Sequence, residues 1–322
     1  MRTTFHLGID VAKTKLDCAL RLPNGKFCAK VVTNDAHGHS DLVDWRAQKE
    51  VMDVHVCMEA TGVYWEDSAQ FLATQGITVS VVNPAQIKAY AASRLTRTKT
   101  DAVDARLIAA FCAERHPPPW QARSEAEVAL RALVLRLDAL QTRRIQESNR
   151  LEVARDTVRT NIQEHLDWLE QQIETLTATI NQHIDSNPNL KGKRELLDSI
   201  PGLGERTIAI LLAFFADPSR FANSRQAAAF GGLDPRQHES GTSVKTKPRL
   251  SKIGHAFLRK ALYMPAMVTL YKTAWGKQFK ERLARSGKPP KLIIGARMRK
   301  LLHVAFGVLK SGKKFDPALH DA

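Results

Sequence analysis

Apolar and polar positions in the first 122 residues follow a pattern of short strands separated by helices. Apolar runs such as Phe5–Val11 (FHLGIDV) are too short for helices, whereas the segments between them repeat with the helical period. Asn24-Gly25 predicts a tight turn between two strands. The expected order is strand Phe5–Val11, strand Lys15–Leu22, strand Phe27–Asn34, helix His37–Lys49, strand Val54–Met58, helix Gly62–Gln75, strand Ile77–Val82, a helix from Pro84 and a helix Thr100–Glu114.

The middle of the chain, from Ser124 to about Ile184, contains neither proline nor glycine and predicts long helices. Leucine and isoleucine recur at alternating spacings of three and four, which is a heptad pattern. A helical hairpin within one chain and a coiled coil that joins two chains both explain this pattern, and both stay open. The apolar positions are Leu130, Leu133, Leu137, Leu140, Ile162, Leu166, Leu169, Ile173, Leu176, Ile180 and Ile184.

The last third of the chain predicts further helices. Pro201-Gly202-Leu203-Gly204, followed at once by an apolar helix to Ala213, is typical of a helix-hairpin-helix element. Its glycines let backbone N–H groups approach a phosphate, and a simple tight turn between helices is the alternative. The other expected elements are a helix Arg194–Ile200, a surface loop Phe230–Val244, helices Arg249–Leu270 and Pro289–Leu309, and a basic, loose tail.

These patterns predict three domains. Residues 1–122 are expected to form an α/β layer fold with a mixed sheet, because strands alternate with helices after an initial meander. Residues 123–187 are expected to form a helical coiled-coil segment. Residues 188–322 are expected to form a mainly α-helical domain with the helix-hairpin-helix-like element.

Charge is distributed unevenly along the 322 residues, whose formal net charge is +15. Residues 1–190 carry 22 basic and 24 acidic side chains, whereas residues 191–322 carry 26 basic and 9 acidic ones. A basic domain of this size most often binds nucleic acid. No apolar run approaches the about 20 residues of a membrane span, and the 4 cysteines show no metal-type spacing. We therefore expect a cytoplasmic protein with reduced, buried thiols and no membrane partner.

The candidate nucleic-acid contacts lie in this basic domain. Contacts to phosphate need N–H groups or cationic side chains, and they carry no sequence information. The candidates are Gly202, Gly204, Arg206, Lys245, Lys252, Arg259 and Lys260.

Four acidic residues of the α/β domain predict a metal site. Asp10 and Glu59 end apolar strands, and Asp101 and Asp104 lie three residues apart on one face of a later helix. Carboxylates at the ends of neighbouring strands converge, and a helix packed on the sheet adds its own. Four oxygen ligands suit one or two Mg²⁺ ions. The alternative is that the two helix aspartates are exposed and favoured only by the helix dipole.

Several motifs together resemble the insertion-sequence 110 family of DEDD transposases. GIDVAK with Asp10, MEATGVY with Glu59, and KTDAVDARLIA with Asp101 and Asp104 are similar to the RuvC-like half of that family. IPGLG, FGGLDPRQHESGTS and SKIGHAFLRKAL are similar to its C-terminal half. The resemblance covers nearly the whole chain in the family's order.

This resemblance implies a DNA recombinase that excises and inserts its own mobile element. An RNase H-type, RuvC-like domain would bind Mg²⁺ through the four acidic residues, and Ser240 in HESGTS would be the catalytic serine. A structured bridge RNA would pair with both target and donor DNA. The chain would act as a homo-oligomer, a dimer or tetramer, in which the serine of one protomer meets the acidic site of another.

From the residues alone, Ser240 is an ordinary loop serine, although Gly241 beside it would let a phosphate approach closely. Two other functions stay open. A Holliday-junction resolvase-like, Mg²⁺-dependent endonuclease would share the acidic site and use water as its nucleophile. A non-enzymatic nucleic-acid-binding protein would use the carboxylates only to hold structure.

Overall fold

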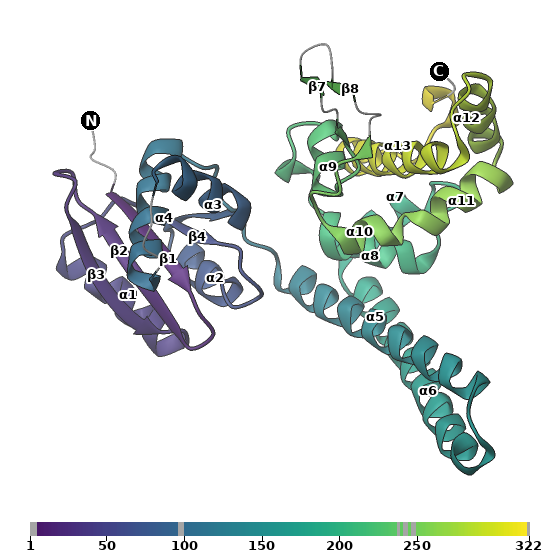
Figure 1. Ribbon diagram of the computed structural model, residues 1–322, viewed down its shortest axis with the longest axis horizontal. Helices are drawn as coiled ribbons and strands as arrows, with labels where there is room; N and C mark the ends of the chain where they lie inside the picture. The colour runs from purple at the N-terminus through teal and green to yellow at the C-terminus, as the bar shows by residue number, and fades with distance from the viewer. Residues whose placement is uncertain (1–4, 96–99, 237–238, 241–243, 246–248, 321–322) are drawn as a thin grey trace. The chain divides into compact units, whose positions relative to one another are not determined.

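The computed structural model describes residues 5–95, 100–236, 239–240, 244–245 and 249–320. The chain divides into two compact units, Met1–Arg123 and Ser124–Ala322 (Figure 1). Each unit has its own hydrophobic core.

The first unit contains a five-stranded mixed sheet with the order β3-β2-β1-β4-β5. β1 (Phe5–Val11), β2 (Lys15–Arg21) and β3 (Phe27–Thr33) form an antiparallel meander. β4 (Val54–Glu59) and β5 (Thr78–Val82) run parallel to β1. This order and these directions are those of the RNase H-like fold. The predicted fold class of the first domain is therefore confirmed, and each predicted strand ends within one residue of the observed one.

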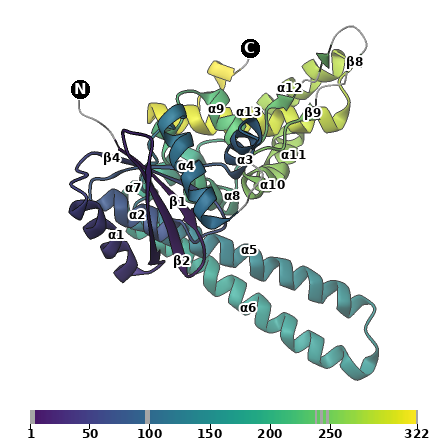
Figure 2. The ribbon, with the colours of Figure 1, turned by 60° about the vertical axis from the view of Figure 1, so that its left-hand side comes forward.

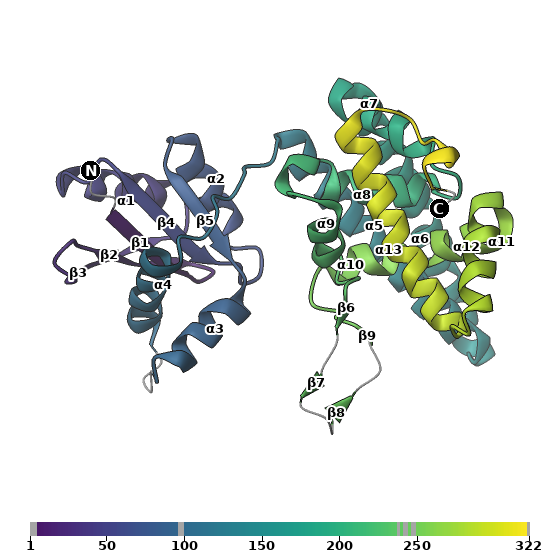
Figure 3. The same ribbon diagram turned by 90° about the horizontal axis from the view of Figure 1, so that it is seen from above.

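Helices cover both faces of this sheet (Figure 3). α1 (Ala36–Gln48) and α2 (Glu66–Thr74) share a core with one set of alternating strand residues. α3 (Pro84–Ser93) and α4 (Asp101–Arg115) pack on the other face, and Figure 2 shows α4 lying across β1. Because side chains alternate along a strand, each strand presents one set of residues to α4 and the other to α1 and α2.

α4 packs closely against the sheet because β1 has a glycine, Gly8, where the helix crosses the strand. A Cβ atom at Gly8 would lie 2.1 Å from the carbonyl oxygen of Ala105 and 2.3 Å from the nitrogen of Ala109. Real Cβ atoms never come so near to backbone atoms, so a larger residue would displace the helix. Ala105 and Ala109 are themselves small and buried. This contact fixes where the first turn of α4 lies above the end of β1.

The second unit begins with a helical hairpin. α5 (Glu125–Glu152) and α6 (Asp156–Ser186) pack on each other, and residues such as Leu130 and Ile184 join the main core of this unit. The far part of the hairpin extends away from the other helices of the unit (Figure 1). The structure thus contains the hairpin within one chain, and it does not test whether the same helices also join two chains.

The helices that follow pack around a buried central helix. α8 (Glu205–Phe215) is buried at every position from Thr207 onward. α13 (Pro290–Ser311) also packs deeply in this core. The remaining elements are α7 (Pro188–Asp198), a 3-10 turn (Pro218–Arg220), α9 (Ser224–Phe230), β6 (Pro235–Arg236), β7 (Glu239–Ser240), β8 (Val244–Lys245), β9 (Arg249–Leu250), α10 (Ala256–Ala261), α11 (Tyr263–Lys272), α12 (Ala274–Arg285) and a 3-10 turn (Pro317–His320).

The predicted single helix Arg249–Leu270 is wrong. Its first residues form β9, which pairs with β6, and the helical part is divided into α10 and α11 at Leu262. Gly254 prevents a continuous helix, because its φ is 145° and a Cβ there would lie 2.5 Å from the nitrogen of Gly232. The apolar period continues through both breaks, so the sequence pattern hides them.

The predicted loose tail is also wrong for the residues that the structure describes. The ring of Phe315 lies against Trp275, with ring centroids 5.0 Å apart. The Phe315 N–H donates a hydrogen bond to the Ser199 hydroxyl at 2.8 Å. One aromatic residue in a basic segment therefore anchors the tail to the helical core.

We expect Gly8→Ala to destabilise the first unit, because the added methyl group would overlap the backbone of α4. Overpacking against backbone that cannot move should lower the free energy of unfolding by about 3 kcal/mol. Urea unfolding followed by circular dichroism measures this change. Gly192→Ala is the matched control, since its Cβ would meet nothing within 4 Å. If Gly8→Ala lowered the free energy of unfolding no more than Gly192→Ala does, the proposed role of this close helix–strand contact would be contradicted.

Candidate active site

Two of the four predicted acidic residues end neighbouring parallel strands. The register of β1 and β4 pairs Gly8 with Cys57 and Ile9 with Met58, so Asp10 and Glu59 follow side by side. By alternation, Asp10 lies on the same face as Gly8, which is the face that α4 covers. The Glu59 carboxylate accepts a hydrogen bond from the Thr61 hydroxyl at 3.0 Å.

The other two acidic residues lie in the first turn of α4. Thr100 caps this helix, with its hydroxyl accepting from the Val103 N–H at 3.3 Å. Asp101 is exposed and Asp104 is half-buried. Negative charge is favourable at a helix N-terminus, which explains why the chain tolerates both aspartates there.

The other acidic residues lie near enough to Asp10 to affect its pKa. Burial, and then repulsion by Asp104 and Asp101, raise the pKa of Asp10 from 3.8 to about 6. Asp17 and Glu59 raise it further. The structure therefore brings the four predicted acidic residues into one electrostatic cluster at the carboxyl ends of β1 and β4.

The sequence analysis did not predict two charged residues that belong to this cluster. Asp17 on β2 pairs directly with Asp10 across the antiparallel strands and is 7% exposed. The Lys15 ammonium lies 2.9 Å from the Asp17 carboxylate and 2.7 Å from that of Asp101. Its hydrogen bonds with Asp101 and Asp17 raise the pKa of Lys15, so the amine stays charged. Alternation along β2, with Lys15 and Asp17 two residues apart, was the available signal.

The chemistry of these carboxylates suits a divalent metal ion. Hard divalent cations take carboxylate oxygens as ligands, and the mutual repulsion acting on Asp10 is what such an ion relieves. Lys15 already balances part of the charge on Asp17 and Asp101. This arrangement leaves Asp10, Glu59 and Asp104 as carboxylates for which the described part of the chain shows no ion pair.

In the second unit, three of the predicted nucleic-acid contacts surround one open cavity. Arg206 on α8 and Arg259 and Lys260 on α10 line a cavity of about 640 Å³, together with Tyr263. Arg206 and Lys260 both contact the Asp138 carboxylate, each at 3.1 Å. We name this feature the α8–α10 cavity. Its cationic rim and partly exposed aromatic ring are the elements that nucleic-acid surfaces use.

Other predicted contacts have local structural explanations. Gly202 has a φ of 95°, and a Cβ there would lie 2.4 Å from a methyl group of Thr269, so packing alone requires glycine. Arg259 donates to the carbonyl oxygens of Gly231 and Lys252, at 3.2 and 3.4 Å, and thereby holds the loop before α10.

The remaining contacts differ in what the structure describes. Gly204 precedes the exposed first turn of α8, where no side chain caps the N–H groups. Lys252 is exposed. The side chain of Lys245 lies outside the described residues.

Ser240 lies on β7, which pairs with β8 within the predicted loop Phe230–Val244. Figure 3 shows β7 and β8 beyond the β6–β9 pair, away from the helices of this unit. The backbone of Ser240 pairs with Val244. The Ser240 side chain and its neighbours 241–243 lie outside the described residues.

An RNase H-like sheet with carboxylates at the ends of β1 and β4 is an arrangement that metal-dependent enzymes acting on nucleic-acid strands can use. Comparison with known proteins agrees. Residues 7–158 match the transposase family of the DEDD IS110 type, and residues 194–281 match the family described as "Transposase IS116/IS110/IS902 family".

The chain is 34% identical over 320 residues to the pilin gene-inverting protein of Moraxella bovis, covering 98% of this chain and 99% of that protein. It is 26% identical over 161 residues to an uncharacterized protein of insertion element IS110 from Streptomyces coelicolor, covering 50% of this chain and 38% of that one. The chain belongs to the IS110 family of transposases, and it is a DNA recombinase.

A RuvC structure from Thermus thermophilus also aligns with the chain. The alignment covers 36% of this chain and 98% of that one, at 16% identity and a TM-score of 0.27. At that score the likeness adds nothing to the strand order described above. No helix in the described ranges is both long and apolar enough to cross a membrane.

We expect Asp10→Asn to stabilise the metal-free protein at neutral pH. The folded pKa of about 6 lies above the unfolded value of 3.8, so the favourable contribution of Asp10 is present below pH 4 and is lost as the pH rises through 6. Urea unfolding in a chelator at pH 7 should show a gain of about 1 kcal/mol, after allowance for solvent screening. The gain should vanish at pH 4. An equal effect at both pH values, or the same gain in Asp41→Asn on the surface of α1, would contradict the cluster.

Proposed function

We propose that this transposase excises and inserts a mobile element, and that Asp10, Glu59, Asp101 and Asp104 hold one or two Mg²⁺ ions for that reaction. The observation that carries the proposal is the placement of Asp10 and Glu59 at the ends of two neighbouring parallel strands, with Asp101 and Asp104 in the first turn of the helix that crosses β1. The raised pKa of Asp10, to which burial and then all three other carboxylates contribute, agrees with that placement. The DEDD family match and the RNase H-like sheet support dependence on a divalent metal. In this proposal the protein acts on DNA in the cytoplasm.

The bound metal would stabilise negative charge on the attacking and leaving oxygens of a DNA phosphodiester. The chain supplies the arrangement around it. β1 and β4 hold Asp10 and Glu59 at fixed strand ends, and Lys15 balances part of the charge on Asp17 and Asp101. The crossing at Gly8 holds the first turn of α4 in place.

We further propose that Ser240 is the nucleophile. Its oxygen would attack a backbone phosphorus, form a serine–phosphate ester and release a DNA hydroxyl as the leaving group. A second DNA hydroxyl would then attack the ester, restore the phosphodiester and return the serine. The motif HESGTS supports this role, because Gly241 beside the serine permits a phosphate to approach. In this proposal the serine of one protomer meets the acidic site of another.

A bridge RNA that pairs with target and donor DNA would give the enzyme its sequence specificity. Pairing by RNA relieves the protein of reading bases, so its own contacts need only hold phosphates. The net basic charge of residues 191–322 and the cations of the α8–α10 cavity support this assignment.

We propose a dimer or tetramer joined through the α5–α6 hairpin. Large apolar side chains are exposed on both helices, including Leu135 and Ile145 on α5 and Trp168 on α6. Trp168 is 48% exposed and Ile145 56%. Apolar groups of this size on a projecting hairpin favour contact with a second helical pair.

Ser240→Ala should abolish a covalent protein–DNA adduct. Full-length protein, Mg²⁺ and labelled DNA from the element's ends are mixed, and the adduct is resolved on a denaturing gel. Ser243→Ala is the matched control in the same segment and should form the adduct normally. An adduct that persists in Ser240→Ala would refute the serine assignment. Cutting of a four-way junction by the wild type without any adduct would favour a resolvase that uses water.

The RNA proposal is tested by expressing the protein with the DNA that flanks its gene and sequencing the RNA that copurifies. One discrete RNA from the flank supports guidance, whereas bulk cellular RNA that is lost in high salt refutes it. Lys260→Gln should release the discrete RNA at lower salt than the wild type does. Lys310→Gln, at the far end of α13, is the control and should leave the release unchanged.

A further inference from the structure

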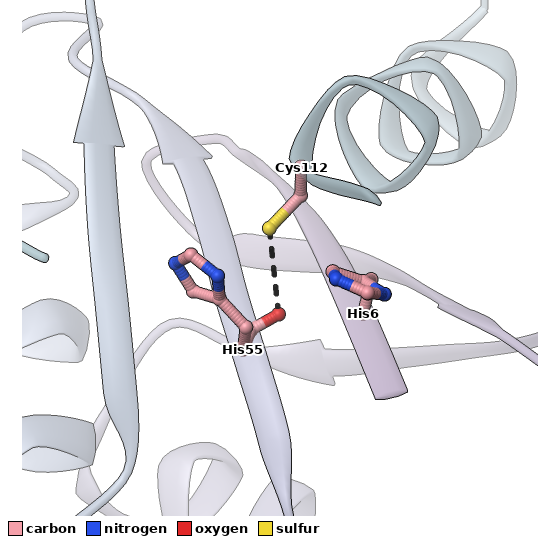
Figure 4. Close-up of side chains that lie close together, drawn as sticks. All are labelled: His6, His55 and Cys112. Atoms are coloured by element: carbon pink, nitrogen blue, oxygen red, sulfur yellow. Dashed lines mark hydrogen bonds between the residues drawn. The ribbon is translucent and has the colours of Figure 1, made fainter. Parts of the chain in front are cut away.

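Three residues of the types that bind metal ions lie close together between the sheet and α4 (Figure 4). His6 is the second residue of β1 and His55 the second residue of β4, and the two are paired in the strand register. Cys112 lies in the last turns of α4. One ligand atom from each of these three residues lies within 4.8 Å of the others. His6 and Asp10 are four residues apart on one strand, about 13 Å, so the two clusters are separate.

The hydrogen bonds of His55 leave one ring nitrogen directed at this cluster. Its Nε2 lies 2.7 Å from the Ser80 hydroxyl, which also lies within hydrogen-bond distance of the carbonyl oxygens of Pro117 and Pro118. The single hydroxyl proton goes to a carbonyl, so the Ser80 oxygen accepts the Nε2 proton. Nδ1 then carries the lone pair. Figure 4 shows a ring nitrogen of His55 on the side of the Cys112 sulfur. Fixing the tautomer of a ligand in this way is typical of metal sites.

His6 and Cys112 lack strong partners of their own. The His6 ring makes no hydrogen bond in the described part of the chain, and burial, followed by repulsion from His55 and His116, lowers the pKa of His6 to about 4. Its ring is therefore neutral and able to bind a metal. The Cys112 thiol lies 3.7 Å from the His55 carbonyl oxygen, a weak contact. A hydrogen bond with Cys57 and then burial raise the pKa of Cys112, and a bound metal ion would remove its proton.

We propose that His6, His55 and Cys112 bind a zinc ion. Imidazole nitrogens with a thiolate are the ligands that Zn²⁺ prefers. Two ligand atoms on tetrahedral zinc lie about 3.3 to 3.5 Å apart, given Zn–N and Zn–S distances of about 2.0 and 2.3 Å. The ligand atoms of His6, His55 and Cys112 lie within 4.8 Å of one another, so small side-chain rotations would bring them to the distances that a zinc ion requires. His116, which ends α4 in a left-handed conformation, has its ring centre 6.0 Å from that of His6. In this proposal His116 or a water molecule would supply the fourth ligand.

This zinc site would join the C-terminal part of α4 to the sheet, at the other end of the helix from the acidic residues. His6 and His55 lie on the strands that carry Asp10 and Glu59, and Cys112 lies on the helix that carries Asp101 and Asp104. An ion at the His–Cys end would thus hold α4 against β1 and β4. The site is structural, and it does not depend on the proposed recombination reaction.

The test uses full-length protein without a polyhistidine tag, purified in a chelator and then titrated with Co²⁺ as a spectroscopic probe for Zn²⁺. A thiolate-to-cobalt absorption band in the near ultraviolet is expected, with the visible bands of a tetrahedral site. Carboxylates cannot produce the thiolate band, so binding at the acidic cluster is distinguished. Zn²⁺ should displace the cobalt and raise the melting temperature.

Cys112→Ser should remove the thiolate band, whereas Cys28→Ser, on β3 and two strands away from β1, should retain it. His6→Gln should weaken Zn²⁺ binding at least about tenfold, whereas His37→Gln on the exposed surface of α1 should not. His6→Gln carries the test if Cys112→Ser fails to fold. Absence of the band in the wild type, or its persistence in Cys112→Ser, would overturn the proposal.

Discussion

The close crossing of α4 over β1 at Gly8 is the contact on which the first unit depends. Backbone meets backbone there, because a Cβ at Gly8 would lie 2.1 Å from the carbonyl oxygen of Ala105. The crossing determines what lies at each end of the helix. Asp101 and Asp104, in the first turn of α4, lie toward the Asp10 end of β1 and contribute to the raised pKa of Asp10, while Cys112 lies near His6 and His55. A residue larger than glycine at position 8 would therefore disturb both the acidic cluster and the histidine–cysteine cluster.

Strand alternation explains why one sheet face carries two kinds of chemistry. β1 and β4 have the same order on the face beneath α4, namely histidine, small residue and acid. His6, Gly8 and Asp10 follow this order, and the corresponding residues of β4 are His55, Cys57 and Glu59. The opposite face of each strand is apolar and packs on α1 and α2. Burial keeps the histidines neutral, and it raises the pKa of Asp10. Burial thus keeps the histidines in the form that binds a metal ion at one end of the sheet face. At the other end it makes a cation beside the Asp10 carboxylate more favourable.

The sequence predicted the strands, the sheet class and the acidic residues, because alternation and strand-end carboxylates are local patterns. It did not reveal Asp17 and Lys15, whose importance comes from the pairing of β2 with β1. It also gave no sign of a role for Cys112, which lies 57 residues from His55 along the chain. The predicted helix Arg249–Leu270 failed because Gly254 and the pairing of β9 with β6 interrupt a continuous apolar period. Pairing between distant segments is the information that a local pattern lacks.

The central claim is that β1, β4 and α4 together form a site for divalent metal ions. Titration of Mn²⁺, monitored by electron paramagnetic resonance, tests it most directly, since Mn²⁺ favours oxygen ligands over the histidine and cysteine cluster. The account predicts one or two bound ions in the wild type, and binding weakened at least about tenfold in both Asp10→Asn and Asp104→Asn. Asp41→Asn, on the surface of α1, should bind as the wild type does. Equal Mn²⁺ binding by the wild type and by the variant that carries both substitutions would contradict the account.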